Sequence, residues 1–443
     1  MKYNRMLRAL AVAVSSTIML AACVGGGGSG TGGAGGADGG SIGVTTSADE
    51  NTLTIWHFET ADSAMGQAWA HAVEIFQAEH PDVEVTVEIQ TFEGIQRNAG
   101  IILRGNDVPD ALLFNKGNAS AGQLAVQGLI QPLDHWVEQY GWDSIVTGAL
   151  QTTSRYDENG QMGSGHWYGI PNNGEFVGMY YNRTMFEAAG IAIPTTSAEL
   201  ESVFQTFLNQ GITPVATAGG EHPLGQIWYQ LVLNHADRSL IDSYQLFTTP
   251  MDFHSAAMVA GTNDFKRWVA EGFIAADAVA LTAEDMGVSF INGTFPMMFS
   301  GSWWFGRLTN EMSDDWGMFL FPESEFALGS AGNLWTIPTN ASSPNLAAAF
   351  IDITLREEVQ NIFAQTGGLP IHGDIDAITD PRAKELTLNF QTLLNNDSLA
   401  FYPDWPVAGF NQALVAETQA LMNGSKTAEQ ALDGLQQAYN QGR

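Results

Sequence analysis

The alternation of apolar and polar residues after residue 50 predicts strands separated by helices. Asn51–Phe58 is rich in β-branched and aromatic residues, and residues 83–89 (VEVTVEI) alternate as a half-buried strand does. Between them, Ser63–His80 carries apolar residues at helical spacing. Asp110–Phe114 has the pattern of a short buried strand. Strands that alternate with helices predict an α/β fold with a mostly parallel sheet.

The pattern continues along the rest of the chain. Phe176–Asn182 predicts a strand that leads into a helix over Arg183–Ala189. Longer runs of helical spacing predict one helix over Gln123–Gln139 and another over Asn345–Ala364. Residues 406–440 are predicted to be helical, with a break at an Asn-Gly pair. No internal repeat is visible, which argues against a repeat architecture.

The first residues have a different pattern, which is typical of a secretory signal. Lys2, Arg5 and Arg8 precede the apolar run Ala9–Leu20, which is too short to span a membrane. The run ends in Leu-Ala-Ala-Cys, which resembles the bacterial lipobox and implies cleavage before Cys23 and lipid attachment to its sulfur. The alternative is an ordinary signal peptide with an incidental cysteine. We prefer lipidation because the only cysteine of the chain occupies this position.

The residues after Cys23 predict a flexible connection. Residues 24–40 are almost all Gly, Ser, Thr and Ala, which cannot bury a hydrophobic core. We therefore expect a signal peptide over 1–22, and a lipidated cysteine with a glycine-rich tether over 23–48. Such an anchor would hold the protein at the extracellular face of a bacterial membrane.

Composition narrows the class of protein. A chain of 443 residues exceeds the usual size of a single-core domain, so two lobes are expected. The formal net charge of −31 at pH 7 argues against nucleic acid as a partner. The histidines are scattered and there is one cysteine, so neither a metal nor a cofactor is predicted. The nucleophile-elbow, zinc-protease and Walker motifs of common enzymes are absent from the sequence.

Several sequence blocks together resemble the family 1 extracellular solute-binding proteins of ABC importers, which include maltose-binding protein. The order and spacing of the blocks cover nearly the whole chain after residue 50. The blocks are LTIWHF (53–58), VPDALLF (108–114), GLIQPLD (128–134), YGIPNNGEFVGMYYNRTMFEAAGI (168–191), GITPVAT (211–217), FINGTFPMMFSGSW (290–303), SSPNLAAAFI (342–351) and GGLPI (367–371).

This resemblance implies a two-lobe periplasmic-binding-protein-like fold, with a hinge of crossing strands and a ligand cleft between the lobes. The chain would cross between lobes near Pro171–Glu175, near Asn333–Thr336 and within His372–Pro381. The N-lobe is expected to comprise 49–172 plus 335–376, and the C-lobe 173–334 plus 377–443.

The implied function is capture of a sugar, an oligosaccharide above others, by a monomer that delivers it to an ABC transporter permease. Within the same class, a glycerol phosphate or another small polar solute is the alternative ligand. The alternative from another class is a secreted glycoside-processing enzyme, since a pair of catalytic acids that meet only in space cannot be seen in a sequence.

A sugar site needs flat aromatic surfaces for the C–H faces and polar groups for the hydroxyls. Trp303 follows the apolar strand FPMMFS and matches the stacking tryptophan of the maltose-binding relatives, although a core position is the alternative. Trp304 is expected to pack in the core. Glu175 matches a ligand-binding carboxylate of the relatives, and Asn173 lies in the same segment.

Further candidates follow other predicted strands, where ligand sites of α/β proteins form. Phe58 and Glu59 end the first strand, after a His57 that we expect to be structural. Asn115 follows the strand at 110–114 and is preferred over its neighbour Lys116.

The remaining candidates rest on looser grounds. Trp228 lies in a predicted helix, and the sequence leaves it open between cleft and core. Asn411 stands where the maltose-binding relatives carry a stacking tryptophan, and Trp405 is left between cleft and core. The other two candidates are Asn333 and Asp404.

Overall fold

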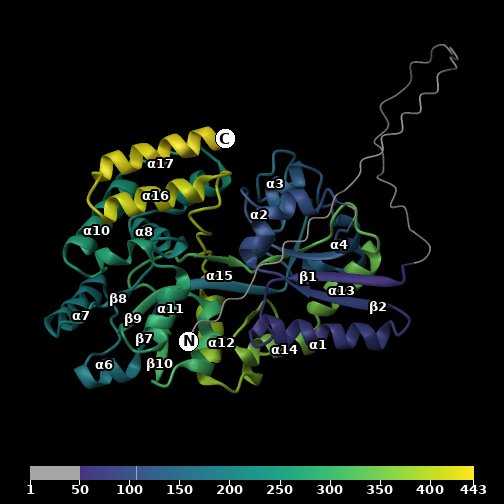
Figure 1. Ribbon diagram of the computed structural model, residues 1–443, viewed down its shortest axis with the longest axis horizontal. Coiled ribbons are helices and arrows are strands. Elements are labelled where there is room, and N and C mark those ends of the chain that lie inside the picture. Colours follow the sequence, from purple (N-terminus) through teal and green to yellow (C-terminus); the bar gives the residue numbers. More distant parts are fainter. Residues whose placement is uncertain (1–49, 106) are drawn as a thin grey trace, which may run out of the picture. The chain divides into compact units, whose positions relative to one another are not determined.

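The computed structural model describes residues 50–105 and 107–443. The predicted signal peptide (1–22) and the predicted lipidated Cys23 with its tether (23–48) lie outside the described residues. Within the described ranges, no helix is both long and apolar enough to cross a membrane. The structure is an α/β fold with two main sheets, as the sequence predicted (Figure 1).

The first sheet has five strands in the order β2-β1-β3-β12-β6. β1 is parallel to β2 and β3, whereas β12 is antiparallel to β3 and β6. All four residues of β3 are buried, because alternate side chains enter hydrophobic clusters on opposite faces of the sheet. The strands are β1 (Thr52–His57), β2 (Glu84–Ile89), β3 (Ala111–Phe114), β6 (Ile170–Pro171) and β12 (Leu334–Thr336).

Helices with local start signals surround this sheet. The Ser63 hydroxyl accepts a hydrogen bond from Gly66 N at 2.9 Å and begins the first helix, which packs against two helices from much later in the chain. These are α1 (Ala64–Glu79), α13 (Pro344–Thr354) and α14 (Glu357–Thr366). The other elements of this part are α2 (Phe92–Ile102), α3 (Ala121–Val126), α4 (Asp134–Tyr140), α5 (Ala149–Thr152), β4 (Arg155–Tyr156) and β5 (His166–Trp167).

The second sheet is mainly antiparallel, which corrects the expectation of mostly parallel pairing. Its path is β10-β7-β9-β8, and only the β8–β9 pair in this path is parallel. The pairing is antiparallel because the long strand β7, which follows directly from the first sheet, has a strand of opposite direction on each side. The strands are β7 (Asn173–Asn182), β8 (Val215–Ala216), β9 (Met297–Gly301) and β10 (Trp316–Phe319).

The chain passes between the two sheets at the start of β7. β6 ends at Pro171 in the first sheet, and β7 begins two residues later. On the return path, β11 (Gly329–Ala331) pairs with β7, and β12 of the first sheet begins at Leu334. β13 (Leu369–Pro370) also pairs with the start of β7. The lobe boundaries 49–172 plus 335–376 and 173–334 plus 377–443 stay a prediction.

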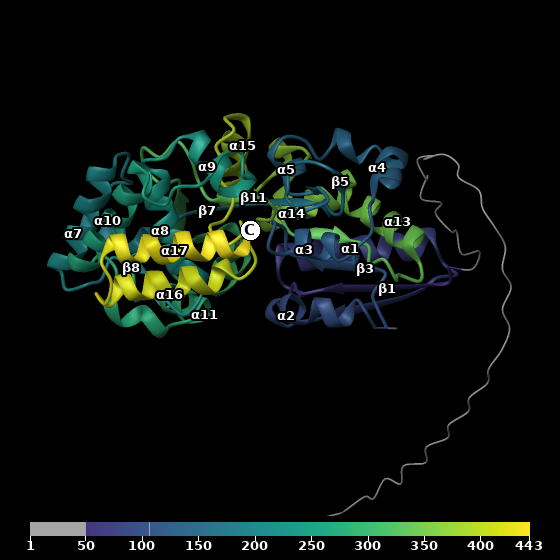
Figure 2. The ribbon, with the colours of Figure 1, turned by 90° about the horizontal axis from the view of Figure 1, so that it is seen from above.

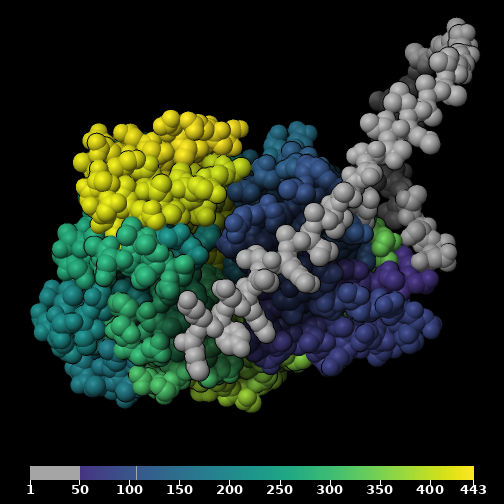
Figure 3. Space-filling view, viewed as in Figure 1, coloured from purple at the N-terminus to yellow at the C-terminus, as the bar shows by residue number. Residues whose placement is uncertain are grey.

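Helices also surround the second sheet, and the two C-terminal ones pack on α8 and α10 (Figures 1 and 2). Their yellow atoms form one continuous part of the surface in Figure 3. The helices are α6 (Arg183–Ala189), α7 (Ser197–Asn209), α8 (His222–Leu233), α9 (Arg238–Leu246), α10 (Ala256–Ala270), α11 (Ala283–Ile291), α12 (Phe305–Glu311), α15 (Pro381–Asn395), α16 (Phe410–Met422) and α17 (Ala428–Gly442).

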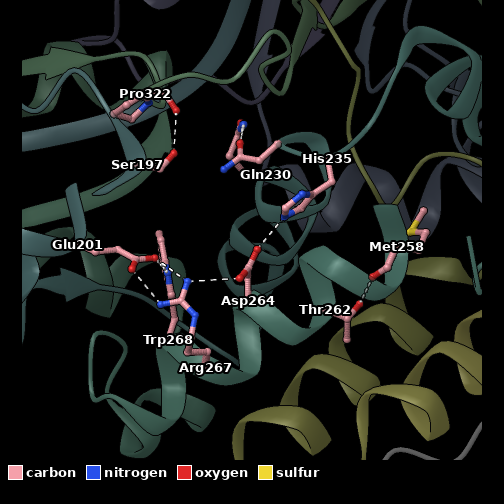
Figure 4. A network of polar contacts seen from close by, with 11 residues as sticks. Ser197, Glu201, Gln230, His235, Met258, Thr262, Asp264, Arg267, Trp268 and Pro322 are labelled. Carbon is pink, nitrogen blue, oxygen red and sulfur yellow. Dashed lines mark hydrogen bonds and ion pairs between the residues drawn. The ribbon is translucent and has the colours of Figure 1, made fainter. Parts of the chain in front are cut away.

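A polar network joins α7 to α10 (Figure 4). Arg267 forms two hydrogen bonds to Glu201, at 2.9 and 2.6 Å, and Trp268 Nε1 donates to the same carboxylate at 3.1 Å. Asp264 accepts from Arg267 at 3.3 Å and lies 2.7 Å from His235 Nε2. These bonds hold α7 and α10 together.

Two predicted helices are each split in the structure. The expected helix at Gln123–Gln139 becomes α3 and α4, because the chain between them forms a β-bridge from Ile130 to Pro338. The expected helix at Asn345–Ala364 becomes α13 and α14, with an extended Arg356 (φ −68°, ψ 147°) at the break. At this break the buried side chain of Gln360 donates through Nε2 to the Thr354 carbonyl at 2.9 Å, and so satisfies a carbonyl group at the end of α13.

Candidate binding site

A cavity of about 480 Å³ lies where the strand ends of the first sheet meet the crossing segments and β9. Residues after β1 and β3 line one side, and residues after β9 line another. The start of β7 and the loop before β12 form the floor between them. The volume is within the usual range for small-molecule sites.

Eight of the ten predicted site residues line this cavity. They are Phe58, Glu59, Asn115, Asn173, Glu175, Trp303, Asn333 and Asp404. Trp405, which the sequence left undecided, also lines it. Residues that are distant in the sequence thus meet at one place, and whether they bind a ligand stays a prediction.

Trp303 has the most exposed aromatic ring of the cavity wall. Trp303 is 41% exposed. It lies two residues after the end of β9. Gly301 makes this position possible, because a Cβ there would lie 1.9 Å from the Trp303 ring. The Trp303 and Tyr402 ring centroids are 6.3 Å apart, and those of Tyr402 and Trp405 are 5.0 Å apart. We call Trp303, Tyr402 and Trp405 the aromatic wall.

The aromatic residues on the first-sheet side have different roles. Phe58 lines the cavity, and its ring packs edge-to-face on Phe92 with centroids 5.0 Å apart. His57 is buried and packs edge-to-face on Trp69 at 5.3 Å. Burial lowers the pKa of His57 to about 4, against a raising effect of its hydrogen bond with the Glu59 backbone. The imidazole is therefore neutral at physiological pH, in line with the structural role expected for it.

An ion pair forms the floor of the cavity. The Lys116 ammonium contacts the Glu175 carboxylate, and their side chains are only 3% and 14% exposed. Lys116 Nζ also donates to Asn333 Oδ1 at 3.4 Å. It lies 5.7 Å from the Tyr402 ring centroid and 5.4 Å from that of Trp405. Lys116, two residues after the end of β3, thus lies next to both crossing segments and to two rings of the aromatic wall.

Glu59, which follows β1, is another carboxylate that lines the cavity. Its pKa is raised to about 7, chiefly because protein atoms surround and desolvate the carboxylate. The Ser63 hydroxyl and the Lys116 charge lower this pKa, and the Glu175 charge raises it. Near neutral pH the Glu59 carboxyl is thus close to half protonated, whereas the Glu175 carboxylate is paired with a lysine.

Two of the ten candidates, Trp228 and Asn411, are not among the residues that line the cavity. Trp228 is fully buried in α8, and its Nε1 donates to Thr262 Oγ1 of α10 at 3.0 Å. All residues of α8 from Pro223 to Leu233 are buried, but its cavity-lining residues are His222, Pro223 and Gln226 and do not include Trp228. Asn411 is in the first turn of α16, outside the cavity.

Sequence reasoning missed several residues that line the cavity. Tyr402 belongs to the loop FYPDW between α15 and α16, where two aromatic residues beside an acid were a usable signal. Lys116 was passed over in favour of Asn115 because nothing local indicates its distant partner. Trp304 is 7% exposed, as its packing role predicted, but it also reaches the cavity with Arg307 5.3 Å above its ring. His222 and Gln226 of α8 are two further examples.

The cavity offers no evident metal site. Among residues 50–105 and 107–443, no group of three or more His, Cys, Asp or Glu side chains is arranged to hold a metal ion. Histidine and acid do meet once at the cavity, where His222 Nε2 lies 3.9 Å from Asp404 Oδ2.

Comparison with known families assigns the chain to a class of protein. The family model described as bacterial extracellular solute-binding protein matches residues 71–386. Because this match covers well over half of the chain, the chain belongs to that family.

Individual relatives are more distant. A probable sugar-binding periplasmic protein of Rhizobium meliloti is 36% identical over 96 residues, which is 21% of this chain and 22% of that protein. The chain thus matches only about a fifth of the length of this curated relative.

Solved structures share the fold along nearly the whole chain. A chitin oligosaccharide binding protein is 18% identical with a TM-score of 0.72, covering 88% of this chain and 98% of that chain. The GacH receptor of Streptomyces glaucescens, studied without ligand and with acarbose, is also 18% identical with a TM-score of 0.72, covering 88% and 97%. At this identity the likeness shows the two-lobe fold with its hinge and cleft.

Proposed function

We propose that this protein captures a carbohydrate, an oligosaccharide above other solutes, and delivers it to an ABC transporter permease. The observation that carries the proposal is the combination of the aromatic wall with a polar floor in one cavity of about 480 Å³. Aromatic rings cover the C–H faces of sugars, and carboxylates and amides accept and donate to their hydroxyls. Several relatives named above bind saccharides by their own descriptions, which supports the same chemistry here.

A glycerol phosphate is a weaker candidate for the ligand. A phosphate site needs cationic groups that are free to meet the anion. Among the described residues, the cavity is lined by the cations Lys116 and Arg307 and by the imidazole of His222, which lies 3.9 Å from Asp404 Oδ2. Lys116 is paired with Glu175, and Arg307 is paired with Glu284 and Glu311. Both charges are therefore already compensated by the protein.

The proposal is tested by screening the purified full chain against neutral oligosaccharides that differ in linkage and length. Thermal shift identifies ligands, and calorimetric titration then gives affinity and stoichiometry. We expect at least one oligosaccharide to raise the melting temperature and to bind at one site per chain. Binding of glycerol 3-phosphate without any saccharide would favour the alternative ligand. Turnover of a chromogenic glycoside would favour the enzyme instead.

We propose further that the protein acts as a monomer, tethered at the extracellular face of a bacterial membrane through a lipid on Cys23. The support is the sequence Leu20-Ala21-Ala22-Cys23 after an apolar run, followed by a glycine-rich stretch. Confinement to the membrane would raise the effective concentration of the binder at its permease. Cys23→Ser is expected to release the protein from the membrane fraction. If the variant fractionates as the wild type does, the anchor is not at Cys23.

A further inference from the structure

We propose that the Lys116–Glu175 pair sets the charge specificity of the cavity, so that neutral saccharides are accepted and anionic ones are rejected. The inference rests on the proposed function and names the ligand class of the same site. In this view Lys116 is an internal counter-ion and a positioning residue for Glu175, and it does not bind the ligand by its charge.

The first step of the argument is the burial of the ammonium. Lys116 is the most buried cation at the cavity, with a side chain that is 3% exposed. An ammonium in such a place is costly unless it is paired, because the desolvation penalty amounts to several kcal/mol. Glu175 supplies the pairing charge, and Asn333 and the two rings of the aromatic wall complete the surroundings.

The second step is that the backbone fixes the position of the lysine. Lys116 N donates to Asn115 Oδ1 at 3.0 Å, and the next residue, Gly117, donates to the Tyr156 hydroxyl at 2.9 Å. Gly117 has φ +96°, and a Cβ there would lie 2.8 Å from the Trp405 ring. The loop after β3 is therefore packed directly against the aromatic wall. Lys116 has little freedom to leave Glu175 and follow a ligand.

The third step concerns what an anionic ligand would meet. Glu59, Asp62, Glu175 and Asp404 all line the cavity. Lys116 and Arg307 are paired with protein carboxylates, and His222 lies 3.9 Å from Asp404, so a carboxylate or phosphate on the ligand would meet these acids beside cationic groups that already have acidic neighbours. Like charges at short range disfavour binding, whereas a neutral hydroxyl can donate to the same oxygens.

Whether the cavity binds an anion should therefore depend on the charge of Glu175. In Glu175→Gln the carboxamide keeps the shape of the side chain but leaves the buried ammonium without its counter-ion. A ligand anion can then supply that charge. In Lys116→Met/Glu175→Gln no buried charge remains, and the reason for binding an anion disappears. The double variant therefore separates unmasking of the lysine from a mere loss of repulsion.

The experiment measures binding of matched probes to these variants by calorimetric titration. The probes are galactose with galacturonate, glucose with glucuronate, the oligosaccharide found in the screen, and inorganic phosphate as an anion independent of sugar shape. Titrations are repeated in a Glu59→Gln background, so that Glu59 does not replace the missing carboxylate, because its pKa falls once Glu175 no longer raises it. Glu201→Gln serves as the control, since it removes an ion-paired carboxylate outside the cavity.

We expect Glu175→Gln to bind a uronate or phosphate at least about tenfold more tightly than the wild type, a change of ~1.4 kcal/mol. The oligosaccharide should bind more weakly to this variant, and the double variant and Glu201→Gln should gain no anion affinity. Melting curves of all variants check that each is folded, and Glu175→Ala, which also removes the counter-ion of Lys116, takes the place of Glu175→Gln if that variant does not fold. The proposal is overturned if Glu175→Gln gains no affinity for either uronate or phosphate, or if the double variant gains as much. Failure of the proposed function is seen separately, as a wild type that binds no neutral saccharide.

Discussion

The surroundings of Trp303 and Trp228 differ, although both are rich in aromatic residues. Trp228 is fully buried, its indole N–H is bonded to Thr262, and it lies beside Tyr229 with ring centroids 6.3 Å apart. Trp303 is 41% exposed, and its ring covers a glycine at the edge of a cavity. One tryptophan is surrounded by protein and the other has a free face.

This difference separates stability from binding. A side chain that is enclosed in the native state contributes its buried area to folding. A side chain with a free face contributes only the area that it already buries, and keeps the rest for a ligand. The two regions should therefore respond in opposite ways to the same substitution.

The largest effect is expected for Trp228→Ala. Removing an enclosed tryptophan leaves a cavity in the core and should lower the free energy of unfolding by about 3–5 kcal/mol. Denaturant unfolding measures this loss, and calorimetry on the folded fraction should give an affinity close to that of the wild type. Trp228→Phe is the control and should lose less. A melting temperature equal to that of the wild type would contradict the core assignment.

Trp303→Ala is expected to reverse this pattern. Loss of a stacking surface should weaken oligosaccharide binding by roughly 2 kcal/mol, which is at least about tenfold in affinity. The melting temperature should change little, because the ring is 41% exposed. Calorimetric titration and a melting curve on the same preparation test both statements. If the variant bound normally and melted much lower, Trp303 would belong with Trp228.

Glu59→Gln should alter the dependence of stability on pH. The pKa of Glu59 is raised to about 7 in the folded protein, above its usual value of 4.5. The folded state therefore retains a proton that the unfolded chain releases between these two values, so stability falls as pH rises through this window. After allowance for partial solvent access, we expect a contribution of about 1–2 kcal/mol. Unfolding curves at pH 5 and pH 8 should differ less in Glu59→Gln than in the wild type; an unchanged difference would rule out this origin.

Gly301→Ala should give the smallest effect and tests how the indole is held. The added methyl group would collide with the Trp303 ring at 1.9 Å, so the ring must shift from its place in the aromatic wall. We expect roughly a fivefold loss of affinity, about 1 kcal/mol. In a Trp303→Ala background the same substitution should cost much less, since the two act through one contact. Equal costs in both backgrounds would show that the glycine serves the strand alone.

The sequence predicted the elements whose ends are set locally. The helix at Arg183–Ala189 has the predicted bounds, because Asn182 caps its start and Gly190 ends it in the left-handed region at φ +67°. The breaks between α3 and α4 and between α13 and α14 were not predicted. The first depends on a distant partner, Pro338, which local spacing cannot indicate. The second interrupts a continuous apolar pattern at the extended Arg356, and periodicity does not show such a change of backbone conformation.

The same division holds for the site. Positions after readable strands, such as Phe58, Asn115 and Trp303, could be placed at the cavity from the sequence. Tyr402 and Lys116 could not, because their meeting requires the loop after β3 to pack on a loop that follows almost 290 residues later. Ala119 N donates to Trp405 O at 3.1 Å. Asn118 Nδ2 donates at 3.2 Å to the carbonyl oxygen of Pro406, which lies 288 residues further along the chain. Trp228 was ambiguous because the spacing of apolar residues in its helix does not show which face meets the core and which meets the cavity; the structure places His222 and Gln226 of α8 at the cavity and Trp228 in the core.

The convergence of three segments on the start of β7 limits the mechanical freedom of the molecule. Gly174 is paired with Ala331 on β11 and with Leu369 on β13, and Gly332 N donates to Asn173 O at 2.7 Å. Three strands joined side by side resist sliding and shear, because such displacement breaks several hydrogen bonds at once. They bend more easily about a line that runs across them. The junction should therefore act as a hinge that allows rotation about a single axis. A ligand that closes the cavity would then fix the angle of that rotation.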